Sequence, residues 1–213
     1  MTTRSTSLAL TRLLLLGGAI AGPLFILTAL LQDYTRPGFD PRLHLLSQLS
    51  LGEWGWVQMA NFTLAGVLNL FYAVGLWRRL HPGPAGTMGP LLIGVYGLCL
   101  ILVGVFTTDP AQGFPPGVPA ATQPSWHGII HALGGLFTFV SLTAALLVFV
   151  RLFLARKERG WAAYLLTSAV LILVIFFGGF TDATLMARTL RLATLIGWLA
   201  ASVIAIKLLC TTK

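Results

Sequence analysis

Charged residues are scarce in this chain, and acidic residues are the scarcest of them. Only 9% of the 213 residues are charged, with six Asp or Glu against fourteen Lys or Arg. A soluble domain usually carries about 25% charged residues. Here 56% of the residues are apolar and the mean hydropathy is +0.86. The chain lacks the polar surface that water requires, so we expect it to reside in a lipid bilayer.

Cysteine is also rare, and the basic residues follow no nucleic-acid pattern. The two cysteines, Cys99 and Cys210, lie in apolar runs near opposite membrane faces, which argues against a structural disulfide between them. The net charge of +8 comes from Lys and Arg at the ends of apolar runs, not from a basic stripe along one face. We therefore expect membrane lipid, and no nucleic acid, as the partner of the basic residues. The sequence identifies no protein partner.

The sequence does contain long apolar runs. About 20 residues of helix cross the hydrocarbon core of a membrane, and six runs are long enough. They predict an all-α fold, a bundle of six transmembrane helices that forms one domain over residues 1–213. The longest connections, 33–54 and 108–126, are about 20 residues each, too short for a further domain. The expected spans cover about residues 11–32, 55–77, 88–107, 127–150, 161–181 and 191–209.

The distribution of Lys and Arg predicts how the bundle is inserted. With the N-terminus inside, ten of these residues fall on the inner side and four on the outer side, which is the bias that the positive-inside rule expects. Five of the six acidic residues and three of the four histidines fall on the outer side. We expect both termini to be cytoplasmic, in a bacterial-type plasma membrane, with a polar site on the extracytoplasmic side.

The first outer loop is predicted to contain a short amphipathic helix over residues 40–52. Asp40 suits the N-cap, and Gly52 suits the C-terminal stop. His44 and Ser47 share the polar face of this helix, and leucines form the other face. The helix then lies on the membrane surface or folds over the mouth of the bundle. For Asp40, capping alone is an alternative to a role in a pocket.

The second predicted span carries polar residues at a depth where lipid offers no hydrogen-bond partner. Gln58 and Asn61 fall on one side of the helical wheel. They are candidates for lining a cavity, and hydrogen bonding between helices is the equally plain alternative.

The second outer loop is predicted to bring a carboxylate to a pair of histidines. Pro110 disfavours helical geometry at Asp109, so Asp109 ends the third span. His127 and His131 stand one helical turn apart at the start of the fourth span, close enough to share a metal ion or a proton. Inward-facing ionisable residues in a membrane are functional candidates. Hydrogen bonding of the histidines to loop carbonyls is the alternative.

A further charged group lies at the outer ends of the fifth and sixth spans. Asp182 and Arg188 are close in sequence there, with Arg191 one turn further on. They are candidates for the edge of the pocket, where they would neutralise a headgroup. Pairing among themselves is the interpretation that their spacing favours.

Together these segments resemble a family of membrane proteins, the domain of unknown function 998. The resemblance implies a six-helix membrane domain and no known reaction. It rests on Arg36-Pro-Gly-Phe-Asp40, His44 through Ser47 to Ser50-Leu-Gly52, Gly55-Trp56 with Gln58 and Asn61-Phe62, Phe106 to Pro110, and the pair His127 and His131.

The residue inventory is also similar to that of the alkaline ceramidase and adiponectin-receptor superfamily. Those proteins are membrane hydrolases whose zinc is held by three histidines, with a serine and an aspartate beside it, so the similarity implies the same cofactor here. The order along the chain differs, because Ser47 follows His44 by three residues instead of preceding it by four. The number of spans also differs, six here against seven.

The sharpest functional hypothesis is a metal-assisted hydrolase or transferase that acts on a lipid or other amphiphile at the outer leaflet. His44, His127 and His131 would ligate Zn²⁺ and leave one position for water, whose pKa zinc lowers to about 7. Asp109 would accept the proton of that water or orient one of the ligating histidines, and Ser47 would stabilise the developing oxyanion.

Two alternatives need no chemistry. The first is a lipid or small-solute binding protein, transporter or sensor that uses the same cavity. The second is an assembly subunit that is held to a partner by glycine-rich faces such as residues 18–22.

Overall fold

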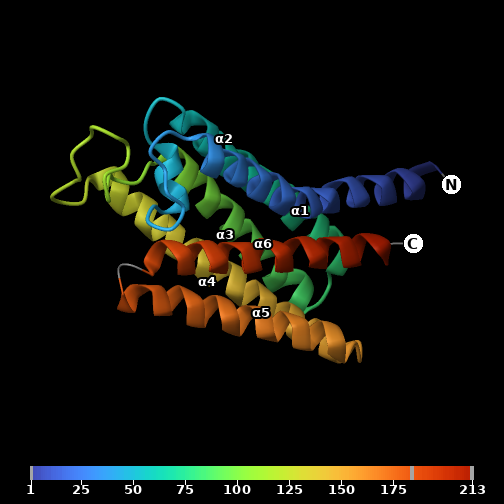
Figure 1. Cartoon of the computed structure of the whole chain (residues 1–213). Helices are drawn as coiled ribbons and strands as arrows, with labels where there is room; N and C mark the ends of the chain where they lie inside the picture. Colours follow the sequence, from blue (N-terminus) through green and yellow to red (C-terminus); the bar gives the residue numbers. More distant parts are fainter. Residues whose placement is uncertain (1, 183–184, 212–213) are drawn as a thin grey trace.

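The structure is a computed structural model that describes residues 2–182 and 185–211 (Figure 1). Within them, six helices are long and apolar enough to cross a membrane, which confirms the predicted all-α, six-helix architecture. Both ends of the chain lie at the same end of the bundle (Figure 1). The helices are α1 Thr2–Thr35, α2 Gly55–Leu80, α3 Pro84–Val105, α4 Trp126–Ala155, α5 Arg159–Gly178 and α6 Met186–Cys210, with two short 3₁₀ helices, η1 Leu46–Ser50 and η2 Gly179–Thr181.

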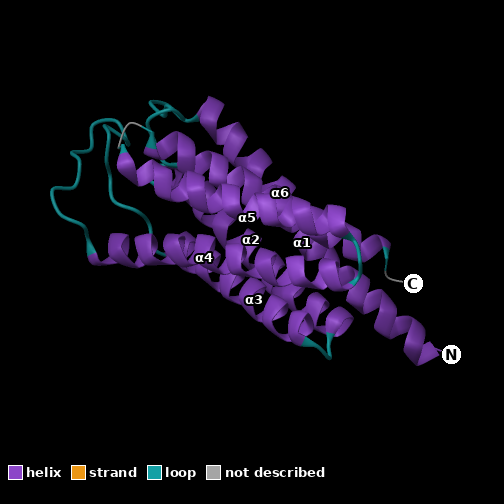
Figure 2. Ribbon diagram, turned by 90° about the horizontal axis from the view of Figure 1, so that it is seen from below, coloured by secondary structure: helices purple, strands orange, loops and turns teal. Residues whose placement is uncertain are grey.

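The six helices form a closed ring in chain order. Each helix packs on the next, and α6 returns to pack on α1, whereas contacts across the ring are few. The long helices lie lengthwise beside one another, with loops at their ends (Figure 2). The connections at 81–83 and 156–158 are short, so they join antiparallel neighbours directly. A ring of this kind can be packed tightly where helices touch and still enclose space at its centre.

Glycines set a close approach of two helices in the ring, between α2 and α3. A Cβ placed on Gly97 would lie 2.8 Å from the Gly66 carbonyl oxygen, and one on Gly66 would lie 2.6 Å from the Gly97 carbonyl oxygen. Small residues allow helix backbones to approach in membranes, where association depends on packing. The two glycines therefore fix the spacing of α2 and α3.

The two long loops pack on each other at the end of the bundle away from the termini, and we call them the cap (residues 36–54 and 106–125; Figure 1). The Gln48 side chain donates to the Ala111 carbonyl at 2.7 Å. Phe39, Leu49 and Phe114 form a small buried core of their own. The cap is thus a folded layer at this end of the ring.

The first loop is not the single helix predicted over residues 40–52. The chain turns at 40–44 and is helical only over Leu46–Ser50. The Asp40 carboxylate accepts the Arg42 N–H, and the Asp40 N–H donates to Nδ1 of His44. These local side-chain bonds close a tight turn in competition with a longer helix. The remaining 3₁₀ helix packs on α2 and α1, so this loop folds over the bundle.

The glycine contact between α2 and α3 yields a stability prediction. Gly97→Ala should lower the thermal unfolding midpoint in detergent, because overpacking of this kind costs about 1 to 3 kcal/mol. Gly94→Ala, one turn away in α3, is the matched control, since its Cβ would meet only Ala73 at 3.9 Å. It should leave the midpoint unchanged or raise it through helix propensity. Circular dichroism at increasing temperature measures both midpoints. Equal midpoints for the two variants would contradict the close approach of α2 and α3.

Candidate functional site: a cavity beneath the cap

A cavity of about 480 Å³ lies in the cap half of the ring, within the range of about 300 to 1,000 Å³ that is typical of small-molecule sites. Its lining runs from His131 to Leu142 on α4 and from Met186 to Trp198 on α6. At 1.5 Å per residue it reaches about 16 to 18 Å along the helices, roughly half of a hydrocarbon core. Most of the lining is apolar. Its polar members are Ser47, Thr108, His131, Thr138, Arg191 and Thr194, and the aromatic residues Tyr96 and Trp198 add a hydroxyl and an indole N–H.

The cavity opens sideways, through the surface of the bundle. Leu133 and Leu136 of α4 line it and are 51% and 36% exposed, and Phe180 after α5 lines it and is 58% exposed. Gly135 also belongs to the lining, and a Cβ placed on it would meet no atom within 4 Å. The opening therefore lies between the cap halves of α4 and α5, on a surface that lipid covers.

The paired histidines join the start of α4 to the end of α3. Nδ1 of His131 lies 2.7 Å from the Phe106 carbonyl oxygen, and Nδ1 of His127 lies 3.1 Å from that of Thr107. A carbonyl only accepts, so each Nδ1 carries the proton and donates it. His131 is buried and lines the cavity, whereas His127 is half-buried and does not.

Asp109 and Ser125 complete this junction. The Asp109 carboxylate accepts the Ser125 N–H at 2.9 Å and the Ser125 hydroxyl at 2.6 Å, while Ser125 caps α4 by accepting the Gly128 N–H. A Cβ on Gly128 would collide with the Asp109 carboxylate, so only glycine lets that carboxylate approach the helix start. The hydrogen bond from Ser125 is the main cause that holds the pKa of Asp109 below 3.8. Asp109 is thus an ionised acceptor at the positive end of α4.

His44 lies in the cap, and its bonds explain why the histidines do not form a zinc site. Nδ1 accepts the Asp40 N–H at 2.8 Å, so Nε2 carries the proton and donates to the Gln112 carbonyl at 3.0 Å. Both ring nitrogens are engaged with the backbone, and the ring packs against Phe39 and Phe114. Within residues 2–182 and 185–211, no group of three or more His, Cys, Asp or Glu is placed to hold a metal ion. The residues do not fit the zinc that the residue inventory implied.

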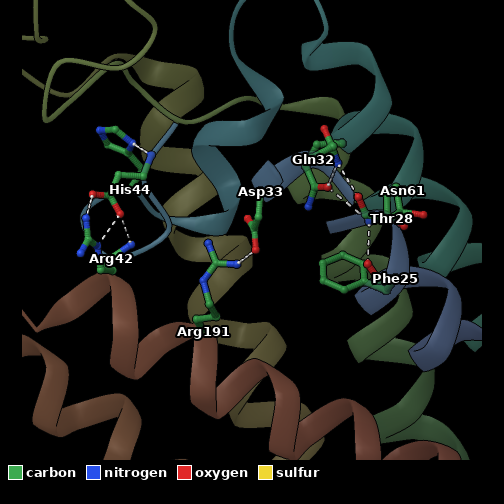
Figure 3. A network of polar contacts seen from close by, with 10 residues as sticks. Phe25, Thr28, Gln32, Asp33, Arg42, His44, Asn61 and Arg191 are labelled. Atoms are coloured by element: carbon green, nitrogen blue, oxygen red, sulfur yellow. Dashed lines mark hydrogen bonds and ion pairs between the residues drawn. The ribbon is translucent and has the colours of Figure 1, made fainter. Parts of the chain in front are cut away.

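An ion pair that sequence reasoning missed links α1 to α6 beside the cavity. Arg191 donates to Asp33 at 2.6 Å, and their side chains are only 17% and 5% exposed (Figure 3). The guanidinium also lies 6.0 Å from the centre of the Phe39 ring, in the cap. The available signal was that the two residues stand at the same end of the first and last spans.

The five residues predicted to line the pocket lie elsewhere. Gln58 and Asn61 face α1, where Gln58 accepts from Gln32 at 2.8 Å and Asn61 donates to the Phe25 carbonyl at 3.1 Å (Figure 3). They form a buried hydrogen-bonded contact between helices, the alternative that the sequence left open.

Asp40 lies at the surface of the cap and pairs with Arg42 at 2.9 Å. Hydrogen bonds from Arg42 lower the pKa of Asp40 to about 2. Asp182 and Arg188 are exposed and lie outside the cavity lining. Of the predicted site residues, only Ser47 and His131 line the cavity itself.

Comparison with known proteins places the chain in a family. The family model described as protein of unknown function (DUF998) matches residues 19–211, nearly the whole chain. The chain belongs to the DUF998 family. No curated protein and no solved structure matches it, so the similarity in inventory to the ceramidase and adiponectin-receptor superfamily has no support. The family assignment of this DUF998 protein covers the second half of α1 and all of α2 to α6, and it names no reaction.

The junction at Asp109 yields a prediction about pH. Asp109→Asn should lower the unfolding midpoint at neutral pH, and the deficit should shrink in acid. The pKa of Asp109 is lowered in the folded protein. Its carboxylate therefore stabilises the fold above the unfolded-state pKa of about 3.9, and this stabilisation is lost as the pH falls through the folded-state pKa.

Unfolding midpoints of both proteins in detergent between about pH 7 and about pH 3 test this prediction. Glu53→Gln, which alters an exposed carboxylate of the cap, is the control and should leave the neutral-pH midpoint unchanged. A deficit that stays constant across the range would show that the ionised form of Asp109 has no special role.

Proposed function

We propose that this DUF998 protein binds a single-chain amphiphile in the cavity beneath the cap and takes it up sideways from the outer leaflet. The observation that carries the proposal is the sideways opening of a largely apolar cavity that has polar groups near the cap. Ser47, Thr108 and His131 supply those groups at the cap end, and Leu142 and Trp198 lie at the deep end. A headgroup then stays near the cap while its tail extends toward the bilayer centre.

The depth and the opening both suit a lipid tail. A tail that enters between α4 and α5 passes the exposed side chains of Leu133 and Leu136 and never leaves an apolar environment. An alkyl chain that reached the cavity through water would have to expose its apolar surface, which is unfavourable. The outward orientation follows from the excess of Lys and Arg at the end of the bundle that holds the termini.

Binding without hydrolysis is the hypothesis that the hydrogen bonds favour. The zinc-dependent mechanism requires a third histidine, and both ring nitrogens of His44 are bonded to backbone groups. It also requires Asp109 beside a reacting water, and Asp109 is bonded to Ser125, the residue that caps the start of α4. Ser47 keeps a role here as a polar contact for the headgroup.

Photocrosslinking in lipid nanodiscs tests the proposal. The probes are an alkyl alcohol, its methyl ether, the carboxylate and the trimethylammonium compound, all with one hexadecyl-length tail that carries a diazirine near its end. At least one probe should crosslink to the deep lining, at Leu142 or Trp198, as mapped by peptide mass spectrometry. Gly135→Phe should reduce that crosslinking about tenfold or more, because a ring at this position fills the opening.

Gly160→Phe is the matched control, since a Cβ there also meets open space but at the start of α5, far from the cavity lining. It should crosslink like the native chain. The proposal would be wrong if crosslinks fell only on lipid-facing residues such as Leu98 and Val170, with equal yield in the native chain and in Gly135→Phe.

A further inference from the structure

The fixed polar groups on the cavity wall accept hydrogen bonds more than they donate them, and His131 is the clearest case. Its Nδ1–H is committed to the Phe106 carbonyl, and the Val103 carbonyl also interacts with the ring. In a neutral imidazole with a protonated Nδ1, Nε2 is a bare acceptor. Nε2 makes no hydrogen bond to any part of the chain that the structure describes, and the ring lines the cavity.

Two threonines add acceptors at greater depth. The Thr138 hydroxyl donates to the Gly134 carbonyl at 2.8 Å, and the Thr194 hydroxyl donates to the Leu190 carbonyl at 2.8 Å. A hydroxyl has one proton, and both protons are used within their own helices. What these side chains offer to a ligand is lone pairs.

The donors near the cap end of the cavity are either covered or adaptable, and the indole N–H of Trp198 lies at the deep end, away from the headgroup. Arg191 uses one amino group on Asp33, and its Nε and Nη2 atoms are fully covered by protein, although the side chain lines the cavity. The hydroxyls of Ser47 and Thr108 rotate, so they pair with a donor or an acceptor equally well. They do not favour one headgroup over another.

We infer that the headgroup this cavity selects is an uncharged hydrogen-bond donor, a hydroxyl, and that His131 Nε2 is the atom that recognises it. The inference deepens the proposed function and rests on it. The ligand class is a neutral single-chain lipid that ends in an alcohol, such as a fatty alcohol or a monoacylglycerol. His131 is then the residue that determines specificity.

Charged headgroups fit the same wall poorly. A carboxylate would face the bare nitrogen of His131 and the lone pairs of Thr138 and Thr194, while Arg191 is already paired with Asp33 and its Nε and Nη2 atoms are covered by protein. A trimethylammonium group has no N–H to give, and in the part of the chain that the structure describes no carboxylate lines the cavity to balance its charge. Burying an unpaired charge costs far more than burying a hydroxyl that finds an acceptor.

The matched probes differ in whether the head oxygen carries a proton or a methyl group, so only the alcohol can donate a hydrogen bond. Hexadecyl alcohol and its methyl ether compete against the crosslinking probe in nanodiscs at about pH 8, above the ordinary histidine pKa of about 6.5. The native chain should prefer the alcohol about 3- to 10-fold, the effect of one net hydrogen bond. His131→Phe should reduce this ratio to about one by weakening the alcohol alone.

His127→Phe is the matched control, because it removes the equivalent Nδ1 bond to a carbonyl of the same junction without touching the cavity. It should keep the preference for the alcohol. Thr194→Val, nearly equal in volume, is a second variant for the case in which His131→Phe does not fold, and it should lower the ratio in part.

Three outcomes overturn the inference: no preference in the native chain, a preference that survives in His131→Phe and Thr194→Val, or tighter binding of the carboxylate or trimethylammonium probe than of the alcohol. Failure of the proposed function is a different result, because then none of the four probes crosslinks within the cavity.

Discussion

Two hydrogen bonds at one helix junction set the chemistry of the cavity. The carbonyls of Phe106 and Thr107 come just after the end of α3, where a helix has no N–H of its own to offer. His131 and His127 supply the missing donors. These two hydrogen bonds join α3 to α4. The Phe106 carbonyl also determines that Nδ1 of His131, and not Nε2, carries the proton. Nε2 of His131 therefore lacks a proton because the Nδ1 proton is used to pair the carbonyl at the end of α3.

The ring of helices is packed unevenly, and the cavity follows from that. Gly66 and Gly97 draw α2 and α3 together until the backbones touch, and Tyr72 fills the space over Gly18 between α2 and α1. On the opposite side, Gly135 faces open space between α4 and α5. Glycine therefore allows tight packing on one side of the ring and leaves a gap on the other. The difference lies in whether the neighbouring helix has atoms close to the glycine. The cap then covers the wider end.

Local sequence patterns predicted the fold and part of the site. Contacts between residues far apart in the sequence could not be predicted from those patterns. The apolar runs predicted six helices, because each run must satisfy its own backbone in lipid. The predicted helix over residues 40–52 was wrong because His44 bonds the Asp40 N–H, a contact that helical periodicity does not describe. The pairing of Asp33 with Arg191 could not be read from spacing, since it joins the first and last helices.

Selectivity in a cavity that opens to lipid differs from selectivity in a water-filled cleft. A tail that moves from the bilayer into an apolar cavity exchanges one apolar environment for another, so the hydrophobic effect contributes little to its affinity. The few polar groups on the wall then account for most of the difference between one lipid and another. An acceptor that is shielded from water and has no partner costs about 1 to 3 kcal/mol, and His131 Nε2 on the cavity wall is in this situation while the cavity holds only tails. A headgroup that donates one proton to it removes that cost, which is why a single imidazole nitrogen can decide which amphiphile is bound.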